Sequence, residues 1–252
     1  LVTYGEIQKI KRINFLGFGN PVLGFSATRE KSTLLPIVSN LLTRNNIGNI
    51  SNIRRLPALP DTAIELKNIS ETLQNNNHQA TLFLGSDATE SQVKTIDLSE
   101  YNIISFATHT LVPQSSSGYA EPAIVLTPPN QASGFDDGLL TSNEIMNLHL
   151  DADLIILSAC NTAASGGLSQ DVYSGLAESF IFAGAKNVLV SHWPVVSEAA
   201  VEIMTNLFQE KMSKPDLSYA QALQLSTAKL AKNRMYEHPL FWAPFSVFSA
   251  SP

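Results

Sequence analysis

Two side chains that could act together in catalysis follow apolar runs that predict buried strands. Cys160, the sole cysteine of the 252 residues, comes after the run 154–157, and His109 follows the stretch 102–108. Residues just past the carboxyl ends of parallel strands share one edge of a sheet, so we expect both side chains at that edge. A thiol beside an imidazole is a nucleophile beside its base, because the imidazole raises the thiolate fraction.

Two alternatives to this dyad stay open. Cys160 could be a buried structural cysteine, although the small residues around it leave room for a substrate. His192 is a rival base, because it follows the predicted strand 187–191. Side chains alternate along a strand, so either His192 or the pair Ser191 and Trp193 faces the cleft. The remaining histidines are interpreted as structural: His78, His149 and His238.

Other chemistries find little support in the sequence. It contains no GxSxG elbow, no Walker loop, no HExxH and no Cys/His zinc spacing, so we expect no metal and no cofactor. Gly17 and Gly19 form a GxG pattern without the third glycine of a dinucleotide loop, which favours a turn. A pair of catalytic carboxylates remains an alternative, but no pair stands out among the acids after residue 67.

Composition restricts the class of protein. The chain is 44% hydrophobic and carries a net charge of −6, with the basic residues concentrated before residue 68. The acidic remainder argues against nucleic acid as a partner, and no apolar run is long enough to span a membrane. Without an initiator Met or a signal-like start, the chain is expected to be a domain from a longer protein, with a cytoplasmic location.

Strand and helix patterns alternate along the chain. Apolar runs predict strands at 13–17, 81–84, 102–108, 123–126, 154–157, 187–191 and 245–248. Helices are predicted between them, and a capping box of Thr62 and Glu65 is expected to begin one of these helices. Capping residues are also expected to begin helices at Thr89, Thr141 and Ser218. Alternating strands and helices predict an α/β fold, with a mostly parallel sheet between two layers of helices. Residues 1–12 are expected to be a lead-in, and residues 13–250 to form a single domain.

Several segments in fixed order resemble the CHAT domain, a bacterial branch of the caspase- and separase-like cysteine peptidases that is usually joined to TPR repeats. The segments are LPALPDTAIEL, LGSDATE, FATHT, LSACNTA, GLAESFIFAGAKNVLVSHWPV and HPLFWAPF. The resemblance extends from about Ile13 to Phe248. It implies a caspase-like three-layer sandwich, a polypeptide substrate and an N-terminal TPR or other partner region outside this chain.

The resemblance also implies roles for particular residues. His109 would be the general base and Cys160 the nucleophile, and the backbone N–H groups of Thr110 and Cys160 would hold the oxyanion. The strand ending at Ser191 and Trp193 would bind the substrate backbone and line its specificity pocket. The calcium dependence of some relatives has no counterpart here, because no calcium loop is visible.

Two departures from the family pattern bear on activity. Thr110 stands where relatives carry glycine, and Val196 and Ser197 stand where relatives often carry an acid that receives a basic side chain. Asp171, Asp136 or Asp137 could replace that acid. The sequence therefore leaves two hypotheses: a cysteine endopeptidase that works through an acyl-enzyme, or a caspase-like binding module that no longer catalyses.

Overall fold

A computed structural model describes residues 13–24, 50–111, 121–158, 170–193 and 195–250. In that part of the chain, six strands form one sheet in the order β2-β1-β3-β7-β8-β9. Five of them run parallel, and β9 pairs antiparallel with β8. The strands are β1 (Asn14–Gly19), β2 (Gln79–Leu84), β3 (Ile103–Ala107), β7 (Leu154–Leu157), β8 (Asn187–Ser191) and β9 (Phe245–Ser249).

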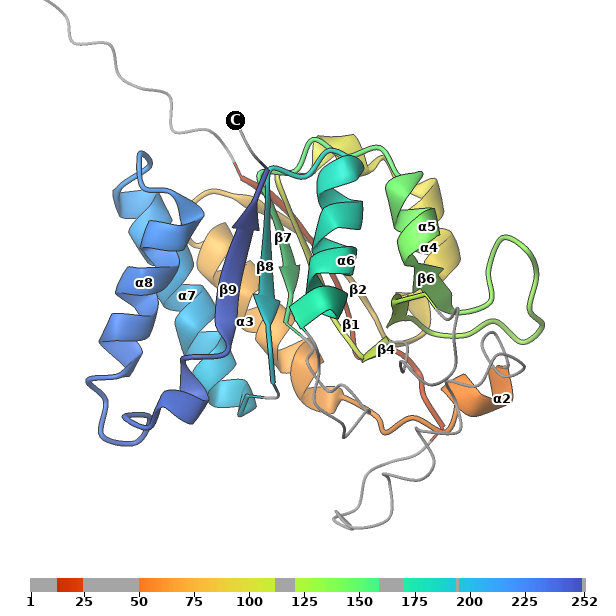
Figure 1. Cartoon of the computed structure of the whole chain (residues 1–252), viewed down its shortest axis with the longest axis horizontal. Helices are drawn as coiled ribbons and strands as arrows, with labels where there is room; N and C mark the ends of the chain where they lie inside the picture. The colour runs from red at the N-terminus through yellow and green to blue at the C-terminus, as the bar shows by residue number, and fades with distance from the viewer. Residues whose placement is uncertain (1–12, 25–49, 112–120, 159–169, 194, 251–252) are drawn as a thin grey trace, which may run out of the picture.

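Helices cover both faces of this sheet (Figure 1). One face packs against α3 (Pro60–Gln74), α7 (Ser197–Ser213) and α8 (Tyr219–Leu230). The other packs against α4 (Glu90–Thr95), α5 (Ser142–Met146) and α6 (Gln170–Phe182). The predicted α/β class, with a mostly parallel sheet between helical layers, is confirmed.

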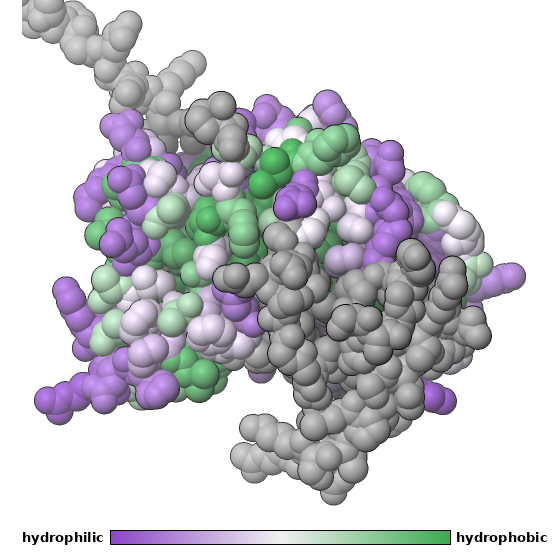
Figure 2. All heavy atoms as spheres, viewed as in Figure 1, coloured by the Kyte–Doolittle hydropathy of each residue, from purple (hydrophilic) through white to green (hydrophobic). Residues whose placement is uncertain are grey.

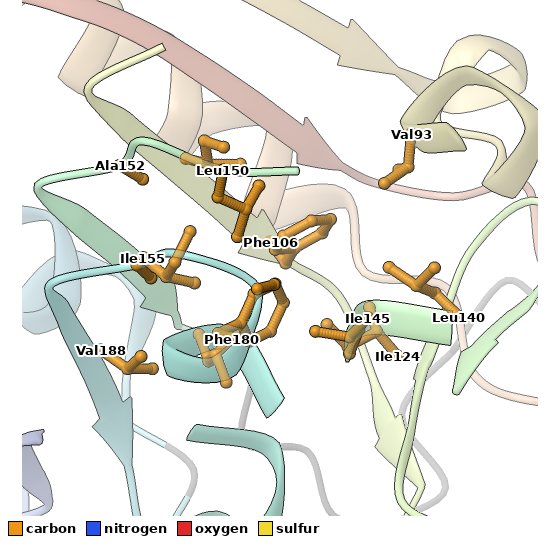
Figure 3. Close-up of a cluster of buried hydrophobic side chains, with 14 of the residues drawn as sticks. Val93, Phe106, Ile124, Leu140, Ile145, Leu150, Ala152, Ile155, Phe180 and Val188 are labelled. Carbon is orange, nitrogen blue, oxygen red and sulfur yellow. The ribbon is translucent and has the colours of Figure 1, made fainter. Parts of the chain in front are cut away.

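Alternating side chains of the strands supply two separate cores. On β3, Ile104 and Phe106 point to the α4–α6 side, while Ile103 and Ala107 point to the α3–α7 side. Figure 3 shows Phe106 beside Phe180 of α6, with ring centroids 5.6 Å apart. The central strands are apolar on both faces, so burial holds β3 and β7 in their places.

A second, smaller sheet was not predicted as such. It contains β4 (Thr110–Leu111), β5 (Ala123–Val125) and β6 (Leu139–Thr141), joined antiparallel in the order β4-β5-β6. Leu111 and Val125 pack with Ile53 of the short helix α2 (Ile50–Ile53). This sheet begins one residue after His109, so it determines how the chain leaves β3. The described residues also include the 3-10 helices η1 (Gly85–Asp87), η2 (Leu98–Glu100) and η3 (Pro239–Phe241).

The helix beginnings confirm most of the capping signals and correct one. Thr89 caps α4, and complete capping boxes begin α5 at Thr141 and α8 at Ser218. The box predicted at Thr62 and Glu65 is wrong, because α3 begins two residues earlier, at Pro60. The Thr62 hydroxyl instead donates to the Leu59 carbonyl and accepts from the Asn20 amide. Glu65 therefore lies within the helix, on its buried side.

Candidate active site

His109 is buried at the end of β3 and is held by a backbone carbonyl. Its side chain has 0% exposure, and its Nε2 lies 2.8 Å from the carbonyl oxygen of Pro57. A carbonyl oxygen can only accept a hydrogen bond, so Nε2 carries the proton in the neutral ring. Nδ1 is then the nitrogen that can accept a proton, which is the form that a general base requires.

The backbone around His109 is fixed by β5. The Thr108 hydroxyl donates to the Val125 carbonyl at 2.6 Å, and the Val125 amide donates to the His109 carbonyl at 2.9 Å. These bonds hold the histidine between the segment before α3 and the smaller sheet. Its position therefore depends on tertiary contacts as well as on β3.

The N–H group of Thr110 points away from β5, its neighbour in the smaller sheet. Thr110 lies opposite Ile124, and the neighbouring residues Val125 and His109 are joined by a backbone hydrogen bond. Thr110 and Ile124 therefore form a non-hydrogen-bonded pair, in which the backbone N–H and C=O groups point away from the partner strand. Among the described residues β4 has no further strand on its other side, which is the side that the Thr110 N–H faces. Asn20 and Asn77 are the non-glycine residues with positive φ in the described part of the chain, so Thr110 adopts its conformation without strain.

Cys160 lies outside the described residues, but the strand that leads to it is well defined. β3 and β7 are neighbours, and Phe106 pairs with Leu157 at the end of their ladder. His109 and Cys160 each follow that pair by three residues along the chain. The sheet topology therefore places the carboxyl ends of β3 and β7 side by side, as the sequence predicted for these two strands. The distance between the two side chains stays a prediction.

His192, the rival base, is held by β9. Its amide donates to the Pro244 carbonyl at 2.9 Å, and its Nε2 lies 2.9 Å from the Ser246 hydroxyl. Burial lowers the pKa of the His192 imidazole, so the ring favours its neutral form. β9 is on the side of β8 away from β7. These contacts tie His192 to β9.

The predicted substrate-binding residues at the end of β8 are closely held. The Ser191 hydroxyl donates to the Trp193 carbonyl at 2.8 Å, and the Trp193 indole N–H donates to the Leu240 carbonyl at 3.0 Å. Ser191 is buried, whereas Trp193 is half-buried and Leu240 is exposed. In Figure 2, hydrophobic residues gather near the middle of the view, over β9 and β8.

The acids considered as replacements for a basic-residue pocket have other partners. Asp136 accepts hydrogen bonds from the Ser91 hydroxyl and amide and from the Gly138 amide. Asp137 accepts from the Leu139 amide at 3.0 Å, and burial raises the pKa of its carboxyl. Both carboxylates hold the loop that precedes β6. The side chain of Asp171 lies outside the described residues.

Glu65 is a candidate residue that the sequence analysis did not identify. Its side chain is 5% exposed on the inner side of α3, and burial raises the pKa of the carboxyl from 4.5 to about 7. The hydroxyl of Ser158, directly after β7, opposes this rise in pKa but lies outside regular hydrogen-bond geometry. The sequence signal for a buried carboxyl was a glutamate close to Leu66 and Ile69 in a predicted helix. It was missed because Glu65 was interpreted as part of a capping box.

Neither a metal-ligand cluster nor a membrane-spanning helix occurs in the described part of the chain. No group of three or more His, Cys, Asp or Glu side chains in that part of the chain could hold a metal ion. Within the same residues, no helix has both the length and the apolar character needed to cross a membrane.

Comparison with known proteins points to one family. The model of the CHAT domain family matches residues 12–250. Two similar proteins carry the name Tetratricopeptide repeat protein 28. The mouse protein is 27% identical over 114 residues, which cover 44% of this chain and 4% of the relative. The human protein is 25% identical over 194 residues, 66% of this chain and 8% of the relative. The chain thus spans less than a tenth of these relatives.

Proposed function

Because the chain belongs to the CHAT domain family, we propose that it is a cysteine endopeptidase with His109 as base and Cys160 as nucleophile. The observation that carries the proposal is the hydrogen bond between His109 Nε2 and the Pro57 carbonyl, at 2.8 Å. This bond fixes the tautomer, so that Nδ1 accepts the proton of the thiol. The family itself comprises relatives of caspase-like peptidases.

The reaction follows from these groups. Nδ1 of His109 takes the thiol proton, and the thiolate forms a C–S bond with the peptide carbonyl carbon. The resulting oxyanion accepts hydrogen bonds from the backbone N–H groups of Thr110 and Cys160. The C–N bond then breaks as the imidazolium gives its proton to the leaving amine. A water molecule releases the acyl group after losing a proton to His109.

The orientation of Thr110 supports this role for its backbone. Its N–H points away from β5, and its backbone is not in the left-handed region. The replacement of the family's glycine by Thr110 is therefore compatible with oxyanion binding. Specificity for a basic residue is not part of the proposal, because Val196 and Ser197 stand where relatives carry the acid. The half-buried Trp193 favours an apolar residue instead.

The full protein is proposed to contain a TPR region that brings substrates or regulators to this domain. The support is the name of the mammalian relatives, which describes tetratricopeptide repeats, together with the small share of their length that this chain covers. A bacterial origin and a cytoplasmic location stay predictions.

A non-catalytic binding module is the second candidate function. The observation that favours it is the complete burial of His109. A base has to reach the substrate's leaving group, so catalysis requires the cleft to open onto this ring. In a non-catalytic module, the same burial would make His109 a structural residue bonded to Pro57.

Substitution of the proposed dyad tests the two candidates. Cleavage of a peptide library and labelling by a thiol-directed peptidyl probe are to be measured for the wild type, Cys160→Ala and His109→Asn. We expect Cys160→Ala to abolish both signals, and His109→Asn to lower cleavage by about 10²- to 10⁴-fold. His149→Asn and His192→Asn serve as matched histidine controls and are expected to keep most of the activity. Cleavage that persists in Cys160→Ala, or a wild type without cleavage or labelling, contradicts the peptidase proposal.

A further inference from the structure

Buried polar atoms without a hydrogen-bond partner are rare in the described part of the chain, and most of them come from one region. Glu65 Oε1, Ser105 Oγ and Ser158 Oγ lack partners there, and the fourth such atom is Asn206 Nδ2. Glu65 is 5% exposed and Ser105 is fully buried. A buried polar atom without a partner destabilises a fold, and an ordered water molecule or ion is a common explanation for one.

The sheet register brings the two serines together on the face that α3 covers. Ser105 lies on β3 between Ile103 and Ala107, and Ser158 follows Ile156 of β7 by two residues. These apolar neighbours pack in the core beneath α3 and α7, so strand alternation turns both hydroxyls to that side. Ser105 pairs with Ile156, which makes the two serines diagonal neighbours, about 7–8 Å apart. That separation excludes a direct hydrogen bond between the hydroxyls and leaves space for a bridging molecule.

Glu65 approaches the same region from α3. It lies on the buried side of the helix with Leu66 and Ile69. Its carboxyl is close enough to the Ser158 hydroxyl for that group to oppose the rise in pKa caused by burial. The two groups nevertheless form no regular hydrogen bond, since Glu65 Oε1 and Ser158 Oγ both lack a partner. Three buried polar groups therefore meet between α3 and two central strands without contacting one another directly.

Water fits this set of groups better than a metal ion does. A buried water molecule makes about three hydrogen bonds, and this region supplies three polar groups. Mg²⁺ and Ca²⁺ need about six or more oxygen ligands, and no group of three or more His, Cys, Asp or Glu among the described residues could hold a metal. Water also suits both protonation states of Glu65, because it donates to a carboxylate and accepts from a carboxylic acid.

We propose that Glu65, Ser105 and Ser158 bind a buried water molecule between α3 and the carboxyl ends of β3 and β7. The water bridges the two hydroxyls and the carboxyl, so it gives each of them the partner that the protein does not supply. Apolar side chains surround the three groups, so this water should exchange slowly with the solvent. The inference does not rest on the peptidase proposal, because none of these residues belongs to the proposed dyad.

The direction of serine-to-alanine effects tests this inference in solution. A hydroxyl that is bonded to water stabilises the fold, so its removal weakens the protein. A buried hydroxyl without any partner destabilises the fold, so its removal strengthens the protein. Urea unfolding is to be measured for the wild type, Ser105→Ala, Ser158→Ala and the double variant. Ser191→Ala is the matched control, because this buried strand serine donates directly to the Trp193 carbonyl at 2.8 Å.

We expect each single variant to be less stable than the wild type. Ser105→Ala and Ser158→Ala should each raise the equilibrium constant for unfolding about two- to twelvefold, as Ser191→Ala does. The double variant should fall short of the product of the two single effects by about twofold or more, because both hydroxyls hold the same water. Alanine variants that stabilise the protein, or single effects that simply multiply, would show that no shared water is bound.

A high-resolution crystal structure of the wild-type protein locates the bound molecule directly. We expect one density peak within about 2.6–3.2 Å of Glu65 Oε1 and of the Oγ atoms of Ser105 and Ser158. Ser105→Ala should weaken or displace this peak. A peak with oxygen neighbours at about 2.0–2.6 Å would identify a cation instead of water. That result, a site without density, or a direct hydrogen bond between Glu65 and Ser158 would each overturn the inference.

Discussion

Replacing Glu65 by glutamine should remove a loss of stability that the wild type suffers as pH rises. The pKa of this carboxyl is raised from 4.5 to about 7 in the folded protein, with burial as the main cause. Between these two values, the folded state binds the proton more tightly than the unfolded state does. Stability from this group is therefore fully present below pH 4.5 and is lost as pH rises through about 7.

The shift in the pKa of Glu65 determines how much the free energy of unfolding changes with pH. A rise from 4.5 to about 7, at about 1.4 kcal/mol per pKa unit, corresponds to about 3 kcal/mol. Glutamine has nearly the same shape as glutamate and carries no charge at any pH. Its own buried amide changes stability by an amount that does not vary with pH, so the difference between wild type and variant isolates the carboxyl.

Denaturant unfolding at pH 5, 6, 7 and 8 measures this difference. We expect the free energy of unfolding of Glu65→Gln to gain on the wild type by about 3 kcal/mol between pH 5 and pH 8. Glu71→Gln removes an exposed carboxylate from the same helix and should stay parallel to the wild type. A difference between Glu65→Gln and the wild type that stays constant with pH would refute the reasoning.

Two further predictions concern the fold around the site, each with a neighbouring control. Gly138 has φ +87°, and an added Cβ would lie 2.8 Å from Pro128 Cα, so Gly138→Ala should lower the free energy of unfolding by about 1–3 kcal/mol. Gly134, with open space around it, should tolerate alanine, and equal thermal shifts for both variants would contradict this account. Phe180→Ala should cost about 3–5 kcal/mol in chemical unfolding because the ring is fully buried against Phe106. Phe182, on the same helix with 77% exposure, should tolerate alanine, and a similar loss there would show that burial does not set the cost.

The sequence was most informative where local chemistry is strong. The strand at 187–191 and the helix beginnings at Thr89, Thr141 and Ser218 agree with the structure. Side-chain caps and apolar runs act over a few residues, so they can be recognised without knowledge of distant partners. The α3 helix shows the limit of this reasoning. Thr62 and Glu65 have the right spacing for a cap, but Pro60 begins the helix and Glu65 turns inward.

The smaller sheet could not be predicted, because its strands have only two or three residues and gain stability from packing on α2. Its pairing determines where the backbone of Thr110 points, which matters for the proposed oxyanion site. The bond from His109 to Pro57 joins residues 52 positions apart. No local pattern reveals such a contact, because it depends on how α3 is placed against β3.

By itself, the sequence determined the fold class, the family and the two segments that carry histidine and cysteine, because apolar periodicity and motif order are local properties of the chain. Only the tertiary structure decided which nitrogen of His109 is protonated, which way the Thr110 N–H points, and that Glu65 faces the end of β7. These features arise from contacts between residues far apart in the sequence, and the burial that shifts a pKa exists only once the layers have packed.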